Sequence, residues 1–139
     1  MSTTHKKEAT VTSSAARTRI LLIEDEASVA AFLRVALERR GYEVVGAGSA
    51  AEGLERLAAE DFGGVISDFR TPGRMTGADV HDWLLNNRPE LSARIIFITG
   101  DTASDETLTL LARSGTPCVE KPFRVHQLMD AVEKTIGRP

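Results

Sequence analysis

The chain has 139 residues, of which 42% are hydrophobic and 27% charged, so it suits one compact domain and leaves no room for a second domain of ordinary size. A formal net charge of −3 argues against a dedicated nucleic-acid surface. The sequence contains neither a signal peptide nor an apolar run near the ~20 residues of a membrane-spanning helix. Its one cysteine, Cys118, excludes an intrachain disulfide. We therefore expect a cytoplasmic protein with no nucleic-acid or membrane partner.

The first 18 residues are rich in Thr, Ser, Ala and Lys and have no hydrophobic periodicity. A segment of this composition cannot bury enough apolar surface to offset the entropy lost on ordering. We interpret residues 1–18 as a disordered tail and residues 19–139 as a single folded domain.

From residue 19 onward, short apolar runs alternate with segments of helical periodicity. Residues 20–23 form an apolar run typical of a strand buried on both faces. Apolar residues then recur at helical spacing up to Gly41, which favours a helix end. Further strands are expected at residues 42–47, 64–68, 94–99 and 116–120. Four further helices are expected. One begins after Ser49, which can cap it, and one runs through Val80 and ends near Pro89. The other two extend over residues 104–113 and 125–136.

Five strands that alternate with five helices indicate a parallel sheet with helices on both faces. This α/β pattern, with five β-α units, is typical of a flavodoxin-like doubly wound fold. The order of the strands does not follow from the periodicity alone.

Polar side chains stand where the predicted strands end, and ligands of open α/β sheets bind outside these carboxyl ends. The set consists of Glu24, Asp25 and Glu26 after the first strand, Asp68 after the third, Thr99 after the fourth and Lys121 after the fifth. Taken singly, each has an ordinary structural role, because an Asp at a strand end often caps a helix and a Lys-Pro pair often forms a surface turn. Their joint occurrence at matching strand ends favours a functional site.

The chemistry of this set fits phosphoryl transfer. Crowded carboxylates repel one another, and Mg²⁺, which prefers oxygen ligands, relieves that repulsion. An aspartate can act as the nucleophile toward phosphorus, while a metal ion and a cation neutralise the phosphoryl oxygens. Asp25 and Asp68 can hold the metal ion. Lys121 can supply the cation, and Thr99 can donate a hydrogen bond.

Four segments resemble the motifs of response-regulator receiver domains of two-component phosphorelay signalling. They are Leu21-Leu22-Ile23-Glu24-Asp25-Glu26, Val65-Ile66-Ser67-Asp68-Phe69-Arg70-Thr71-Pro72-Gly73, Phe97-Ile98-Thr99-Gly100 and Glu120-Lys121-Pro122-Phe123. The similarity extends over about residues 19–136. It implies a flavodoxin-like (βα)5 fold with strand order 2-1-3-4-5. It also implies a signalling domain that is no enzyme beyond catalysing its own phosphorylation and dephosphorylation.

The resemblance implies a role for each acidic residue. Asp68 would accept a phosphoryl group from a histidine kinase or a histidine phosphotransfer protein. Asp25, Asp68 and the backbone carbonyl of Arg70 would ligate Mg²⁺ or Mn²⁺. Glu24 would act on the metal through a bound water, and it replaces the commoner Asp with a side chain longer by one methylene.

The remaining site residues receive roles in the same way. Lys121 would contact the phosphoryl group, the Lys121-Pro122 bond would be cis, and Thr99 would act as a switch residue. Cys118 stands where many receivers carry the Tyr or Phe of the switch, and its small side chain cannot make the same movement. We expect Cys118 to be an inert core residue. Gly100 leaves room for attacking water, so we expect a phosphorylated lifetime that is not unusually long.

The other chemically distinctive side chains fit structural roles. His5, His81 and His126 lack the spacing of a metal site and are expected on the surface. Trp83 is expected to cover one edge of the sheet.

The last predicted helix is followed by three residues, so we expect a stand-alone domain, a monomer or weak dimer, without an effector domain. Residues 115–121 resemble receivers attached to hybrid sensor kinases. An unidentified downstream protein would bind the face formed by the fourth helix, fifth strand and fifth helix. The alternatives are a phosphate sink, a phosphorylation-independent module and an aspartyl phosphatase, which would need an acid where Arg70 stands.

Overall fold

The computed structural model describes residues 19–69, 73–100, 109, 112–113 and 115–139. The expected tail at residues 1–18 and most of the expected helix at residues 104–113 lie outside these ranges.

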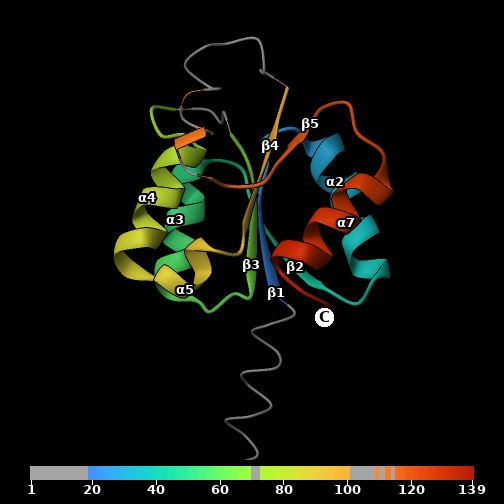
Figure 1. Ribbon diagram of the computed structural model, residues 1–139, viewed down its shortest axis with the longest axis horizontal. Coiled ribbons are helices and arrows are strands. Elements are labelled where there is room, and N and C mark those ends of the chain that lie inside the picture. The colour runs from blue at the N-terminus through green and yellow to red at the C-terminus, as the bar shows by residue number, and fades with distance from the viewer. Residues whose placement is uncertain (1–18, 70–72, 101–108, 110–111, 114) are drawn as a thin grey trace, which may run out of the picture.

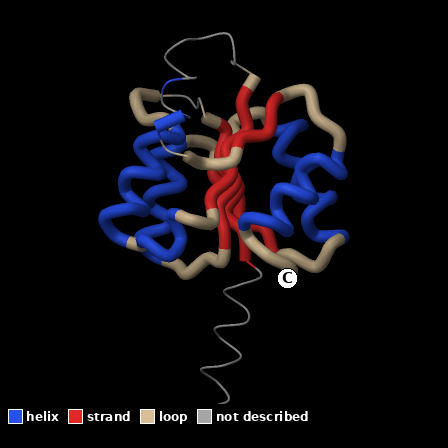
Figure 2. The backbone as a smooth tube through the Cα atoms, in the orientation of Figure 1, coloured by secondary structure: helices blue, strands red, loops and turns tan. Residues whose placement is uncertain are grey.

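A single parallel sheet forms the centre of the molecule (Figure 2). Its strands are β1 (Arg19–Ile23), β2 (Glu43–Ala47), β3 (Gly64–Asp68), β4 (Ile95–Thr99) and β5 (Cys118–Glu120). They lie in the order β2-β1-β3-β4-β5, and every neighbouring pair is parallel. The flavodoxin-like fold and the strand order 2-1-3-4-5 are therefore confirmed.

Helices cover both faces of the sheet (Figure 1). They are α2 (Ala27–Arg39), α3 (Ala50–Ala59), α4 (Gly77–Asn87), α5 (Pro89–Ser92) and α7 (Val125–Thr135). Helices α2 and α7 lie on one face, and α3, α4 and α5 lie on the other. The short helix α5 was not expected from the sequence, because Pro89 was interpreted only as a helix end although proline also fits the first turn of a helix. None of the described helices has the length and apolar character needed to cross a bilayer.

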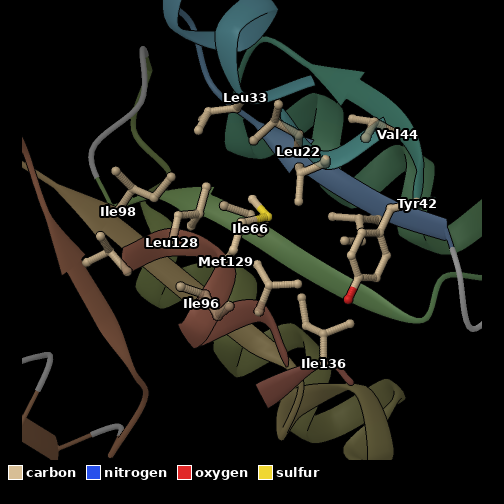
Figure 3. Packing of buried hydrophobic residues seen from close by; sticks show 14 residues of the cluster. Leu22, Leu33, Tyr42, Val44, Ile66, Ile96, Ile98, Leu128, Met129 and Ile136 are labelled. Atoms are coloured by element: carbon tan, nitrogen blue, oxygen red, sulfur yellow. The ribbon is translucent and has the colours of Figure 1, made fainter. Parts of the chain in front are cut away.

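Two hydrophobic clusters flank the sheet, because successive residues of a strand point to opposite faces. Ile20 and Leu22 of β1 belong to the cluster that α2 and α7 cover; Figure 3 shows this cluster, with Leu128 of α7 among its members. Leu21 and Ile23 belong to the cluster that α3 and α4 cover. Burial of β1 on both faces explains its uninterrupted apolar sequence.

The residues at the helix ends make the capping interactions that their types favour. Ser49 caps α3, since its hydroxyl accepts a hydrogen bond from the N–H of Glu52 at 3.1 Å. Gly41 follows α2 with a φ of 101°, a conformation that glycine adopts without strain. Thr76 caps α4, and its N–H donates to the Asp79 carboxylate at 2.7 Å. This cap fixes the start of α4 shortly after the end of β3.

His81 corrects one expectation. It is 8% exposed, not a surface residue, because it shares the sheet-facing side of α4 with Val80 and Leu84. Its ring lies edge-on to Phe97 of β4, with 6.4 Å between the ring centroids. Trp83 is half-buried against the cluster on the same face. His81 is therefore part of the packing between α4 and the sheet.

Candidate functional site

The carboxyl ends of β1, β3, β4 and β5 bring the expected polar residues together at one edge of the sheet. The register pairs Asp68 with Ile98 and Thr99 with Glu120, so the residues that follow these strands emerge side by side. The Nζ atom of Lys121 lies 2.9 Å from Oδ2 of Asp68 and 3.2 Å from Oε1 of Glu24. Residues separated by 53 and 97 positions in sequence thus share one pocket.

Lys121 is held in place by both its main chain and its side chain. Its N–H donates to the carbonyl of Thr99 at 2.8 Å, which continues the pairing of β4 with β5. Desolvation opposes the charge of the Lys121 ammonium, but the hydrogen bond and charge of Asp68, together with Glu24, outweigh it and raise its pKa. The ammonium group therefore stays charged beside Asp68.

Glu24 is a buried acid at the end of β1. Its side chain is 0% exposed, and its second oxygen, Oε2, accepts a hydrogen bond from the N–H of Glu26 at 3.1 Å. Burial raises the pKa of Glu24, while the Glu26 N–H and the charge of Lys121 limit that rise. Both carboxylate oxygens of Glu24 thus have a partner within the described part of the chain.

Three carboxylates have the spacing of a metal site. Glu24, Asp25 and Asp68 each offer one oxygen atom, and these atoms lie within 4.8 Å of one another. One ammonium group faces this set, which leaves an excess of negative charge. Oxygen donors and excess negative charge both fit a hard divalent cation such as Mg²⁺. Arg70, whose carbonyl was expected as a further ligand, lies outside the described residues.

The backbone behind Asp68 is fixed by contacts that the sequence interpretation did not include. The N–H of Phe69 donates to the carbonyl of Ile98, and its own carbonyl accepts from the N–H of Gly77, both at 2.8 Å. A Cβ atom on Gly77 would lie 2.9 Å from a ring carbon of Phe97, so a larger residue there would displace that ring. The available sequence signal was a glycine at the start of a helix, which does not reveal its neighbour on β4.

Comparison with known proteins identifies the family. Residues 20–133 match the response regulator receiver domain. This chain belongs to the receiver-domain family. The family consists of signalling domains of two-component response regulators, which generally accept a phosphoryl group.

Two curated relatives show the range of proteins in which such a domain occurs. Over 118 residues the chain is 33% identical to the response regulator receiver protein CpdR of Brucella abortus (strain 2308), covering 85% of this chain and 96% of CpdR. Over 98 residues it is 34% identical to the CAI-1 autoinducer sensor kinase/phosphatase CqsS of Vibrio cholerae serotype O1, covering 70% of this chain but 14% of CqsS.

A solved structure supports the same assignment. The response regulator receiver domain protein (CheY-like) from Methanospirillum hungatei JF-1 matches with a TM-score of 0.76 and 28% sequence identity. The match covers 85% of this chain and 92% of that one.

Thr99 and Cys118, the residues expected at the switch positions, lie on the neighbouring strands β4 and β5. Thr99 is 1% exposed at the end of β4. Cys118 is exposed, so its expected place in the core is wrong. Since β5 has three residues and Val119 points into the core beside α7, Cys118 and Glu120 point outward. Partial desolvation, aided by the charge of Glu120, raises the pKa of the Cys118 thiol, which favours its less reactive protonated form.

The Lys121-Pro122 peptide bond of this receiver is cis, as the resemblance implied. His126 is exposed, as expected, and His5 lies outside the described residues.

Proposed function

We propose that this receiver domain accepts a phosphoryl group on Asp68 from a histidine kinase or a histidine phosphotransfer protein, with Mg²⁺ or Mn²⁺ as cofactor. The observation that carries the proposal is the 2.9 Å contact between the Lys121 ammonium and the Asp68 carboxylate, beside two further carboxylates. A nucleophile, a cation and oxygen ligands for a metal ion thus occur within one pocket.

Each residue has a distinct task in the proposed reaction. A carboxylate oxygen of Asp68 forms a bond with phosphorus as the bond from phosphorus to the donor nitrogen breaks. Lys121 neutralises charge on the phosphoryl oxygens, and Thr99 donates a hydrogen bond to one of them. Asp25, Asp68 and the carbonyl of Arg70 would hold the metal ion, with Glu24 near it. When bound, the ion would supply further neutralisation of the phosphoryl oxygens.

We propose that the phosphodonor protein docks on the exposed side of α2. Phe32 and Val35 are 51% and 48% exposed there, which is unusual for large apolar side chains one helical turn apart. A groove lined in part by Phe32 and Phe123 runs to Lys121 at the mouth of the pocket. A protein that covers this surface would bring its phosphohistidine to Asp68, because the groove and the pocket share Lys121.

We propose that output uses a different surface, the groove between β5 and α7. Glu120, Gln127, Asp130 and Lys134 line it together with Cys118. Most of the expected helix at residues 104–113, the third part of the output face, lies outside the described residues. We propose that the domain acts through this face as a monomer or weak dimer.

Incubation with acetyl phosphate and Mg²⁺, followed by intact-mass measurement, tests the function. We expect the gain of one phosphoryl group, its loss in Asp68→Asn, and its retention in the matched control Asp82→Asn, which changes an exposed aspartate of α4. Absence of modification in the native chain would favour a phosphorylation-independent module. Continued hydrolysis of phosphate esters would favour a phosphatase.

A further inference from the structure

Glu24 makes two hydrogen bonds, one that fixes its own carboxylate and one that holds Lys121. Its Oε2 is tied to the backbone N–H of Glu26 at 3.1 Å, which fixes the carboxylate relative to β1. Its Oε1 accepts from Nζ of Lys121 at 3.2 Å. A side chain with 0% exposure and both oxygens bonded has little freedom to move.

Lys121 needs such an anchor more than the other site residues do. Its side chain has four rotatable carbon-carbon bonds, and 24% of its surface is exposed. Its other partner is Asp68, the proposed nucleophile. When Asp68 takes up a phosphoryl group, the ammonium must exchange the Asp68 oxygen for a phosphoryl oxygen. The hydrogen bond to Glu24 does not have to break for that exchange.

We propose that Glu24 is a positioning residue that holds Lys121 in the pocket before and during phosphoryl transfer, a role separate from any contact with the metal ion through water. The inference rests on the proposed function of Asp68. Glutamate is longer than aspartate by one methylene, and the Glu24 carboxylate bonds both the Glu26 N–H and the Lys121 ammonium.

The dependence of the phosphorylation rate on Mg²⁺ concentration distinguishes the two possible roles of Glu24, positioning of Lys121 and metal binding through water. If Glu24 positions Lys121, Glu24→Gln lowers the rate at saturating Mg²⁺ about tenfold, the size expected for one charged hydrogen bond, and changes the Mg²⁺ dissociation constant less than about threefold. Asp25→Asn serves as the contrast and weakens Mg²⁺ binding about tenfold or more. Calorimetry gives the dissociation constants, and acetyl phosphate gives the rates.

A double-mutant cycle decides whether Glu24 acts through Lys121. In a Lys121→Ala background, Glu24→Gln should cause no further loss of rate, because the ammonium that it positions is gone. An equal loss in both backgrounds, or a tenfold weaker Mg²⁺ affinity with an unchanged maximal rate, would overturn the inference. Glu24→Asp, which keeps the charge but shortens the reach, is expected to lose rate as Glu24→Gln does.

A readout without phosphorylation separates this inference from the proposed function. Amine-selective acetylation of Lys121, followed by peptide mass measurement, should be several-fold faster in Glu24→Gln than in the native chain. The control Glu55→Gln changes an exposed carboxylate of α3, outside the site residues, so it should not alter the labelling rate. Unchanged labelling in Glu24→Gln would contradict the positioning role. Absent phosphorylation of the native chain would instead contradict the function of Asp68.

Discussion

Gly100 follows Thr99 at the rim of the pocket, and the space around it allows a sharp test of water access. A Cβ atom at this position would lie 3.8 Å from Cβ and 3.9 Å from Cδ of Lys121, which is ordinary contact distance. A side chain therefore fits there and stands beside the aliphatic part of Lys121, whose ammonium group faces Asp68. The small residue keeps one approach to the proposed acyl phosphate open.

We predict that Gly100→Val slows the loss of the phosphoryl group several-fold, because the branched side chain narrows the approach of water. The decay is measured by intact mass after removal of acetyl phosphate. Gly48→Ala is the control, since its Cβ would also be in ordinary contact, 3.7 Å from Glu52, but at the end of β2. A native half-time of many hours, or equal decay in Gly100→Val, would contradict the prediction.

Tyr42 connects the start of β2 to the end of the chain. It is 4% exposed, and its hydroxyl donates a hydrogen bond to the carbonyl of Gly137. Burial raises the pKa of Tyr42, and the charge of Glu133 adds to this. The neutral phenol is therefore favoured more strongly in the folded chain than in the unfolded chain.

We predict that Tyr42→Phe lowers the free energy of unfolding at neutral pH by about 1 kcal/mol, the usual net value of one hydrogen bond. The folded pKa is raised, so the native contribution is complete below the unfolded pKa of about 10 and is lost as pH rises above it. Urea unfolding of both proteins from pH 7 to pH 11 measures the difference. A difference that stays constant across this range would rule out the titration of Tyr42 as its source.

At the scale of elements, α2 differs from the other described helices in having two large apolar side chains exposed to solvent, whereas α4 and α7 have one each. Its inner face packs in the cluster shared with α7, as expected for an amphipathic helix. Phe32 and Val35 lie on the other face and remain exposed. This second apolar face is what the proposed docking of a phosphodonor requires.

We predict that Phe32→Ala reduces phosphoryl transfer from a phosphohistidine protein about tenfold, because a well-packed aromatic anchor is lost from the interface. Transfer from acetyl phosphate should not change, since Phe32 is exposed on α2 and is not one of the residues that we propose bind the metal ion or the phosphoryl group. Leu85→Ala is the matched control, because Leu85 is 52% exposed but lies on α4, across the sheet. Equal losses with both donors would point to the pocket instead of docking.

Elements with long apolar signals were predicted together with their buried faces, whereas the short strand β5 was predicted without the direction of its side chains. The buried runs of β1, β3 and β4 were evident because both faces of these strands are covered. Strand β5 has three residues and one buried side chain, so its sequence does not reveal which residues face outward. Cys118 was misplaced for this reason. His81 was misplaced because residue polarity was given more weight than its position on the inner side of α4.

At the scale of the whole molecule, the site depends on the meeting of distant strand ends. The strand-end rule predicted which residues belong to the pocket, and the resemblance supplied the strand order that makes Glu24, Asp68 and Lys121 neighbours. The sequence could not show that Lys121 bonds two carboxylates at once, because that depends on the register of three strands. Nor could it show that Glu24 is fully buried.

We predict that Mg²⁺ stabilises the folded domain, because it offsets repulsion among three carboxylates that exists only after folding. At a hundred times its dissociation constant, Mg²⁺ should raise the free energy of unfolding by about 2.7 kcal/mol. Asp25→Asn should lose most of this gain, whereas Glu55→Gln, which changes an exposed carboxylate of α3, should keep it. Thermal unfolding with and without Mg²⁺ provides the measurement, and a gain that persists in Asp25→Asn would argue against the site.

The outward position of the only cysteine has a practical consequence. Cys118 is exposed on β5, three positions before Lys121 in sequence, and the chain has no second thiol to compete for reagents. A maleimide fluorophore can therefore be attached at this one place without engineering the protein. The fluorescence of the attached dye would then report changes in the β5–α7 groove as acetyl phosphate is added. No cysteine has to be introduced or removed for this measurement.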